Sequence, residues 1–125
     1  MNKKTTRQLV AVVDDDRSIQ SALKDLLESV GLFPECFGSA EEFLASDQLN
    51  QTGCLVLDVR MPGMSGLELQ AKLKTEGSQI PIIFITARGD TKTKIQAMKA
   101  GALEFLSKPF DDEVLLESVR AALRG

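Results

Sequence analysis

The sequence predicts a single α/β domain in which a parallel sheet is covered by helices on both faces. Apolar segments of strand length alternate five times with segments whose apolar residues follow the helical period. Three of the strand segments are near-continuous apolar runs, which is typical of strands buried on both faces. The chain has 125 residues, of which 43% are hydrophobic and 26% charged, so its size and composition are those of one globular domain.

Five segments are expected to form the strands of this sheet. In chain order they cover residues 10–14, 34–37, 54–58, 81–86 and 103–107. The second segment is interpreted as an edge strand. Right-handed crossovers between consecutive strands then give an open, doubly covered sheet.

The segments that connect the strands are predicted to be helices from their apolar stripes, capping residues and terminal glycines. One helical stripe runs through the segment after the first strand, at Ile19, Leu23, Leu26, Leu27 and Val30. Another runs through the last segment, at Val114, Leu115, Ala122 and Leu123. Capping-box spacing occurs twice, at Ser39 with Glu42 and at Ser65 with Glu68. Glycines stand where helices should end, at Gly31, Gly77 and Gly101.

Composition excludes several classes of function. A net charge of −3 gives no general electrostatic reason to bind nucleic acid or an anionic membrane. The longest apolar runs are far too short to span a bilayer, and residues 1–8 hold no apolar stretch fit for a signal peptide, so a cytoplasmic protein is expected. The absence of histidine excludes Ser-His-Asp catalysis, histidine-ligated zinc and a phosphohistidine carrier.

Charged and polar residues gather where the predicted strands end, which is the edge of an open parallel sheet that binds ligands. These residues are Asp14, Asp15, Asp58, Thr86 and Lys108. Two carboxylates about 4 Å apart repel each other by roughly 4 kcal/mol at an effective dielectric constant near 20, so the aspartates need a partner. For the aspartates alone, another interpretation is equally open: Asp16 caps the next helix while its two neighbours point into water.

A cluster of carboxylates without histidine or cysteine suits Mg²⁺, which takes one or two carboxylates together with waters and a phosphate oxygen. Phosphoryl transfer needs a nucleophile in line and neutralisation of the charge on the equatorial oxygens. Asp58 can be that nucleophile and form an aspartyl phosphate. Lys108 can hold one phosphoryl oxygen and Thr86 can donate a hydrogen bond to another. Taken singly, Thr86 can equally cap a strand and Lys108 can be a solvated charge.

Four motifs in register resemble the receiver domain of response regulators. They are VVDDD at 12–16, LVLDVRMPGMSGLEL at 55–69, FITA at 84–87 and AMKAGALEFLSKPF at 97–110. The resemblance covers residues 8–124 and leaves residues 1–7 as an N-terminal tail. It implies a flavodoxin-like sheet with strand order 2-1-3-4-5 and five helices. In that order Cys36 and Cys54 lie two strand spacings apart, roughly 9 to 10 Å, which is too far for a disulfide.

The resemblance also implies roles for the site residues. Asp58 would accept a phosphoryl group from a sensor histidine kinase. Mg²⁺ would be bound by Asp15, Asp58 and the backbone carbonyl of Arg60, with Asp14 assisting through a water molecule. The sequence MPGMSG (residues 61–66) and the segment 89–110 are most similar to those of FixJ-type transcriptional regulators. In these regulators a DNA-binding helix-turn-helix follows the receiver. These 125 residues include no such output domain, so either a stand-alone receiver or part of a longer regulator is expected.

Further expectations concern switching and tuning. The family has an aromatic residue at Phe105 that turns inward when Thr86 shifts toward the phosphate, although simple core filling also explains a buried phenylalanine. The resemblance also implies that the Lys108-Pro109 peptide is cis, which would direct the lysine back into the site. Arg60 and Arg88 stand two residues beyond the acceptor and the threonine, where many relatives carry carboxylates or amides able to orient a hydrolytic water. One hypothesis is that the aspartyl phosphate loses its phosphoryl group slowly; the alternative is that both arginines are simply solvated.

A phosphorylation-dependent homodimer is a further possibility. The segment 90–100 carries lysines and the start of the last helix carries acidic residues, so a two-fold axis across this face would bring opposite charges together. Solvated helix surfaces explain the same charges nearly as well.

Other classes of function remain as alternatives. A flavodoxin-type module is disfavoured because three aspartates would repel the FMN phosphate, and GxxxxGK and GxGxxG loops are absent from the sequence. A haloacid-dehalogenase-type phosphatase also uses an aspartate, a lysine and Mg²⁺, but its general acid would stand where this chain has Arg60. A degenerate receiver that acts only as a docking surface is a third alternative.

Overall fold

The structure, a computed structural model, describes residues 8–87 and 90–124. Five parallel strands form one sheet in the order β2-β1-β3-β4-β5, so the predicted strand order and the edge position of the second strand are confirmed. The strands are β1 (Leu9–Val13), β2 (Phe33–Phe37), β3 (Thr52–Asp58), β4 (Ile82–Thr86) and β5 (Glu104–Ser107). Each lies within two residues of the predicted range, because buried parallel strands carry a strong apolar signal.

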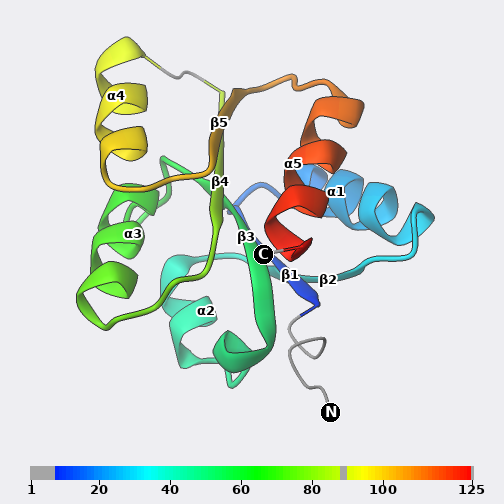
Figure 1. Cartoon of the computed structure of the whole chain (residues 1–125), viewed down its shortest axis with the longest axis horizontal. Coiled ribbons are helices and arrows are strands. Elements are labelled where there is room, and N and C mark those ends of the chain that lie inside the picture. Colours follow the sequence, from blue (N-terminus) through cyan, green and yellow to red (C-terminus); the bar gives the residue numbers. More distant parts are fainter. Residues whose placement is uncertain (1–7, 88–89, 125) are drawn as a thin grey trace.

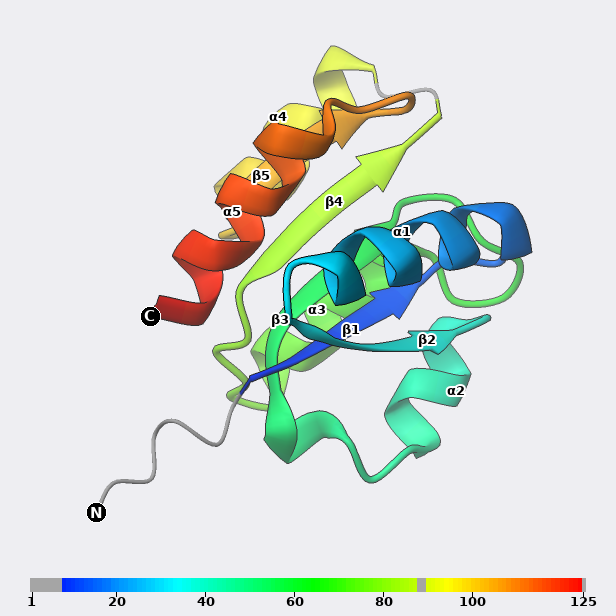
Figure 2. The same ribbon diagram turned by 90° about the vertical axis from the view of Figure 1, so that its right-hand side faces the viewer.

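Helices follow the strands along the chain. They are α1 (Arg17–Ser29), α2 (Ala40–Ala45), α3 (Gly66–Thr75), α4 (Thr91–Lys99) and α5 (Asp112–Arg124), and a short 3-10 helix, η2 (Leu49–Gln51), precedes β3. Figures 1 and 2 show α1 and α5 together on one side of the sheet and α2, α3 and α4 on the other. The architecture is therefore the doubly covered sheet that the sequence predicts.

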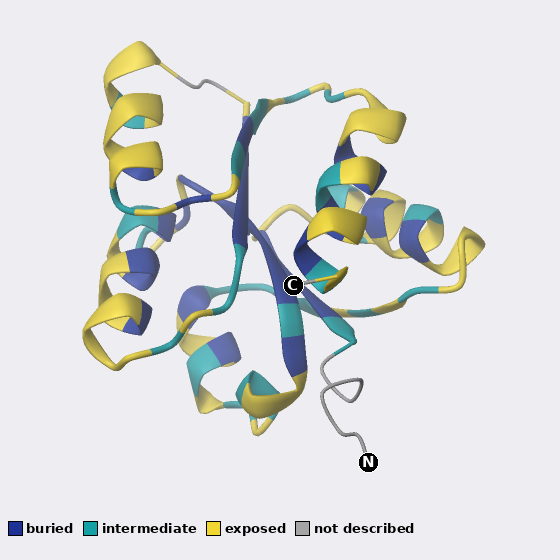
Figure 3. Ribbon diagram, viewed as in Figure 1, coloured by how far each residue is buried: buried dark blue, intermediate teal, exposed yellow. Residues whose placement is uncertain are grey.

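Alternate residues of the strands pack into two separate hydrophobic cores, one on each face of the sheet. On the side of α1 and α5, Val10, Val12 and Val56 pack with helix residues such as Leu23 and Leu115. Their neighbours in sequence face the other side, where Leu55 and Leu57 join residues of α2, α3 and α4. Figure 3 shows buried strands at the centre and exposed outer helix surfaces. Both faces of the central strands β1, β3 and β4 are thus largely apolar, and their polar side chains lie at the strand ends.

Two residues of the predicted helical stripes lie outside these cores. Val30 is the C-cap of α1 and is 37% exposed, and Val114 in the first turn of α5 is 42% exposed. The helical period places both near the apolar face, but each lies at a helix end, where the helix extends past the sheet residues that it covers.

The predicted helix ends agree with the structure, with one difference. Ser65 and Glu68 form a complete capping box at the start of α3. At α2, Ser39 accepts the backbone N–H of Glu42 as predicted, but the Glu42 carboxylate accepts from Gly38 rather than from Ser39. Gly31, Gly77 and Gly101 follow helix ends with φ between 82° and 104°, a conformation that glycine adopts without strain.

Both cysteines are free thiols, as predicted, because β1 lies between the strands that carry them. Burial raises the pKa of the Cys54 thiol to about 12, so this group is an inert part of the core. Within residues 8–87 and 90–124, no helix has the length and apolar character needed to cross a membrane.

Candidate functional site

Three carboxylates meet at the carboxyl ends of β1 and β3. Val13 pairs with Leu57, so the residues that follow, Asp14 and Asp58, emerge side by side. Together with Asp15 they offer one oxygen each, and these oxygens lie within 4.8 Å of one another. The sheet register therefore brings together the acidic residues that the sequence predicts as a site.

Lys108 reaches this cluster from the end of β5, the edge strand that lies beyond β4. Its Nζ lies 2.8 Å from Asp14 Oδ2 and 3.7 Å from Asp58 Oδ2. The lysine follows β5, and its backbone N–H donates to the carbonyl of Thr86 at 2.8 Å. The Lys108-Pro109 peptide is cis, as predicted. One ammonium against three carboxylates leaves two negative charges uncompensated when all are ionised, which a single divalent cation would balance.

Asp14 is the most constrained of the three carboxylates. It is completely buried, and its Oδ1 accepts the backbone N–H of Asp16 at 2.9 Å while Oδ2 accepts from Lys108. Its backbone carbonyl also accepts from the side chain of Gln20 at 2.6 Å. Both oxygens of Asp14 already have protein donors, whereas the carboxylate of Asp15 is exposed and open to direct ligation.

The alternative interpretation, a helix cap with solvated neighbours, is correct for Asp16 but not for Asp14. Asp16 Oδ1 accepts the N–H of Ser18 at 2.8 Å and caps α1. Asp14, however, does not point into water, since it is buried beside Asp58 and Lys108. The cap and the acidic cluster therefore coexist in the three consecutive aspartates.

The surroundings of Asp58 disfavour its charged form. Burial and the neighbouring charge of Asp14 raise the pKa of this carboxyl to about 6, against the opposing effects of Lys108 and of the nearby backbone N–H of Arg60. A divalent cation at the cluster would reverse this balance. The donor set is all oxygen, contains no histidine or cysteine and fits Mg²⁺.

Thr86 and Phe105 occupy neighbouring strands beside the acceptor. Thr86 ends β4 one residue after Ile85, which pairs with Asp58, and it is buried. Phe105 is 7% exposed, and its ring centroid lies 6.0 Å from that of Phe84. Phe105 thus belongs to the core in this conformation, an arrangement that both core filling and an inward switch residue would show.

Of the two predicted tuning residues, Arg60 and Arg88, the structure describes only Arg60. Arg60 is exposed, and its backbone lies near Asp58 as stated above. Arg88 lies outside the described residues.

Gly66 lies against the acceptor, although it is not among the site residues predicted from the sequence. Its N–H donates to the carbonyl of Val59 at 2.9 Å, and a Cβ at this position would lie 2.2 Å from the carbonyl oxygen of Asp58. The first residue of α3 therefore packs directly on the backbone of the predicted acceptor. A capping-box serine followed by glycine is the signal that could have indicated this close approach.

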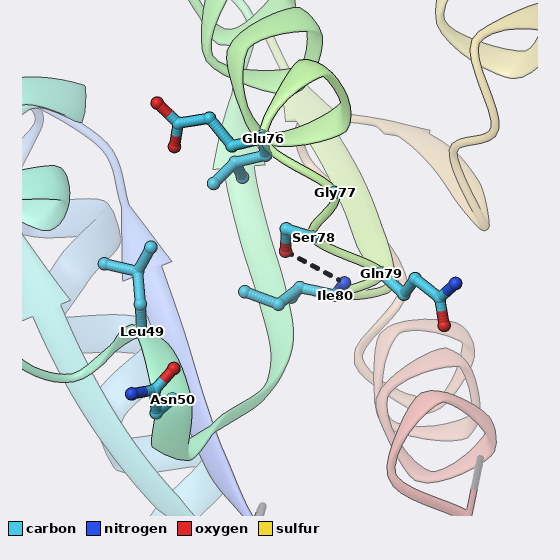
Figure 4. Close-up of a pocket in the computed structure, with 8 residues that line it drawn as sticks. Leu49, Asn50, Glu76, Gly77, Ser78, Gln79 and Ile80 are labelled. Atoms are coloured by element: carbon cyan, nitrogen blue, oxygen red, sulfur yellow. Dashed lines mark hydrogen bonds between the residues drawn. The ribbon is translucent and has the colours of Figure 1, made fainter.

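A hollow lies at the opposite end of the sheet. It has a volume of about 440 Å³ and lies beside the segments that lead into β3 and β4, where Ser78 Oγ accepts the N–H of Ile80 (Figure 4). Glu76 is the charged residue of its lining. The hollow lacks the cluster of carboxylates that characterises the other end of the sheet, so the carboxyl edge is the candidate functional site.

Comparison with known proteins decides the family. The sequence pattern of the response regulator receiver domain matches residues 10–120. The chain belongs to the response regulator receiver domains. The receiver assignment from the four motifs is therefore confirmed, and Arg60 occupies the position where the phosphatase alternative would need its general acid.

Individual receivers from two-component systems resemble the chain closely. Response regulator protein TodT of Pseudomonas putida is 50% identical over 116 residues, which cover 93% of this chain and 51% of TodT. Transcriptional regulatory protein FixJ of Azorhizobium caulinodans is 46% identical over 114 residues, covering 91% of this chain and 54% of FixJ. The solved structure of response regulator StyR superposes with a TM-score of 0.86 at 51% identity, covering 93% of this chain and 59% of that one. This receiver thus spans about half the length of the curated relatives it matches.

Proposed function

We propose that this receiver takes a phosphoryl group onto Asp58 from a sensor histidine kinase in a Mg²⁺-dependent reaction. The observation that carries the proposal is the convergence of Asp58, Asp14 and Asp15 with Lys108 at one edge of the sheet. In the transfer, an Asp58 carboxylate oxygen forms a bond to phosphorus while the bond from phosphorus to the kinase histidine nitrogen breaks. The histidine leaves and takes up a proton from water.

The residues of the site have separate tasks in this reaction. Mg²⁺ held by Asp15, Asp58 and the carbonyl of Arg60 would neutralise phosphoryl oxygens, with Asp14 acting through water. Lys108, which stands between two carboxylates, would pair with one oxygen of the aspartyl phosphate. Thr86, at the end of the adjacent strand, would donate to another.

Intact mass spectrometry after incubation with acetyl phosphate and Mg²⁺ tests the proposal. A gain of about 80 daltons corresponds to one phosphoryl group. The gain should require Mg²⁺ and should vanish in Asp58→Asn. No gain in the folded wild-type protein would favour the degenerate receiver that acts by docking alone.

We further propose that phosphorylation is read out on the face formed by α4, β5 and α5. Exposed apolar side chains lie on its helices, at Ile95 and Met98 of α4 and at Val114 of α5. Lysines Lys92, Lys94 and Lys99 lie on α4, and acidic residues Asp112, Glu113 and Glu117 lie on α5. Movement of Thr86 and Phe105 would alter β4 and β5 beneath it, and two such faces would pair as a homodimer. A phosphorylated protein whose association ignores ionic strength would argue against the charged contacts.

The wider role follows from relatives that are transcriptional regulators. We propose that residues 8–124 serve as the regulatory receiver of a cytoplasmic transcription regulator, with DNA contacts made elsewhere than in this segment. Arg60 and Arg88 would give slow loss of the phosphoryl group, because neither side chain can act as a base toward water.

A further inference from the structure

The segment between β3 and α3 connects the predicted acceptor to an outer helix. This β3–α3 loop (residues 59–65) begins next to Asp58, and the backbone N–H of Arg60 lies near enough to the Asp58 carboxylate to lower its pKa. Its base is closed by the hydrogen bond from Gly66 N–H to the Val59 carbonyl at 2.9 Å. The path of the loop therefore decides where the Arg60 backbone stands relative to Asp58.

The far side of the loop is held by a residue of α2. Glu41 Oε2 accepts the backbone N–H of Met64 at 2.9 Å, across 23 positions of sequence. Gly63, the preceding residue, has φ of +77°, and a Cβ at Gly63 would lie 2.7 Å from the same oxygen. The carboxylate thus occupies the space that a side chain at 63 would fill, and the loop backbone and Glu41 fit one another.

We propose that Glu41 is a positioning residue for phosphoryl transfer, acting through the β3–α3 loop. The inference rests on the proposed function, since the loop carries the Arg60 backbone groups that lie beside Asp58 and would help to hold the cation. The Gly66–Val59 hydrogen bond joins the two ends of the loop, and Glu41 holds it at Met64, so Arg60 lies in the stretch between the held residues Val59 and Met64. Without the carboxylate, the loop loses a charge-assisted hydrogen bond and samples conformations in which Arg60 is displaced.

The neighbouring residue provides a matched control. Glu42 lies on the same helix, carries the same charge and also accepts a backbone N–H, from Gly38 at 2.7 Å, but it does not touch the loop. Any effect of charge alone on Mg²⁺ or on acetyl phosphate should therefore appear at both positions. An effect that needs the hydrogen bond to Met64 should appear at Glu41 only.

The test compares Glu41→Ala, Glu41→Gln and Glu42→Gln with the wild-type protein. Hydrogen exchange of the Met64 amide in EDTA reports the tether without metal or phosphate. The Mg²⁺ dissociation constant and the rate of Asp58 phosphorylation by acetyl phosphate report the site. Loss of one such hydrogen bond in Glu41→Ala should raise Met64 exchange, weaken Mg²⁺ binding and slow phosphorylation, each by about 5- to 10-fold. Glu41→Gln keeps an acceptor oxygen and should restore most of each value, and Glu42→Gln should match the wild type in all three.

Two results would overturn the inference while the proposed function stands. One is a wild-type rate of phosphorylation in Glu41→Ala. The other is an equal loss in Glu41→Gln and Glu42→Gln, which would assign the effect to charge. If the wild-type protein itself gains no phosphoryl group, the proposed function fails and the positioning role fails with it, whereas the Met64 exchange still shows whether the tether exists.

Discussion

Lys108 Nζ donates to Asp14 Oδ2 at 2.8 Å, although the two residues stand 94 positions apart in the chain. The pair joins the end of β1 to the end of β5 across the carboxyl edge of the sheet. Because Asp14 is fully buried and its other oxygen is also occupied, its carboxylate fixes the lysine rather than competing for the space above Asp58. The ammonium is thereby held 3.7 Å from the acceptor, close enough to pair with a phosphoryl oxygen added there.

The raised pKa of Asp58 predicts how stability depends on pH in EDTA. Between its ordinary value of 3.8 and about 6, the folded protein keeps a proton that the unfolded chain has lost. The free energy of unfolding should therefore fall as pH rises through this window, by up to about 3 kcal/mol, and stay low above pH 6. Asp58→Asn removes this contribution, so it should be the more stable protein at pH 7 and gain little at pH 4. Urea unfolding at pH 4 to 7.5 checks this, and a constant difference between the two proteins would contradict it.

Mg²⁺ should reverse the electrostatic cost of the acidic cluster. Binding to the folded state alone stabilises it by about 2.7 kcal/mol at a concentration one hundred times the Kd, so Tm should rise with Mg²⁺. Asp15→Asn should abolish this rise while stabilising the metal-free protein, because it removes an exposed ligand and one of three clustered charges. Asp16→Asn is the matched control, since asparagine preserves the helix cap and removes a charge that lies outside the cluster. Differential scanning fluorimetry separates the variants, and a Tm rise retained in Asp15→Asn would exclude this residue as a ligand.

Much of this arrangement follows from patterns that the sequence displays. Apolar runs mark the buried strands, and the rule that ligands bind at the carboxyl ends of parallel strands brings Asp14, Asp58 and Lys108 together before any coordinates are known. The pattern says less about loops. The contact between Glu41 and Met64 and the approach of Gly66 to Asp58 depend on the path of the β3–α3 loop, which no periodicity encodes.

The same limit applies to helix ends. The spacing of Ser39 and Glu42 predicts a reciprocal box, but the carboxylate bonds to Gly38 because the chain entering α2 presents that N–H instead. Likewise, the helical period assigns Val114 to the core, whereas its position in the first turn of α5 leaves it exposed. Local pattern predicts which element forms, and tertiary packing decides what its terminal residues contact.

Gly66→Ala should damage both the fold and the site. A methyl group placed 2.2 Å from the Asp58 carbonyl oxygen would force α3 or the acceptor backbone to move, at a cost of about 1–3 kcal/mol in unfolding free energy. The displacement acts on the backbone of Asp58, so phosphorylation by acetyl phosphate should slow even at temperatures where the variant is folded. Gly38→Ala is the control, because its added Cβ would meet Glu42 at an ordinary contact distance of 3.6 Å. Equal behaviour of the two alanine variants would show that the close approach is unimportant.

Gln70 links α3 to α4 at a position separate from the site. Its buried side chain donates to the Ala97 carbonyl at 3.0 Å, and that carbonyl also accepts the N–H of Ala102. Gln70→Leu keeps the volume and leaves Ala97 with one donor, so it should cost only about 0.5–1.5 kcal/mol. Hydrogen exchange should rise in α4 and remain unchanged in α1, which packs on the other face of the sheet. Uniform change over both helices would indicate global destabilisation instead.

Arg60→Asn should shorten the lifetime of the aspartyl phosphate. The substitution leaves the backbone N–H of residue 60 near the acceptor and replaces an exposed guanidinium with an amide able to orient water. One added hydrogen bond to the attacking water corresponds to a rate increase of about 2- to 10-fold. Arg60→Ala separates the two effects, because it removes the arginine without supplying the amide. Decay of the phosphorylated mass after removal of acetyl phosphate gives the rates. Loss in Arg60→Asn no faster than in the wild type would refute the tuning role, and equal acceleration in Arg60→Ala would show that the arginine shields the phosphate from water.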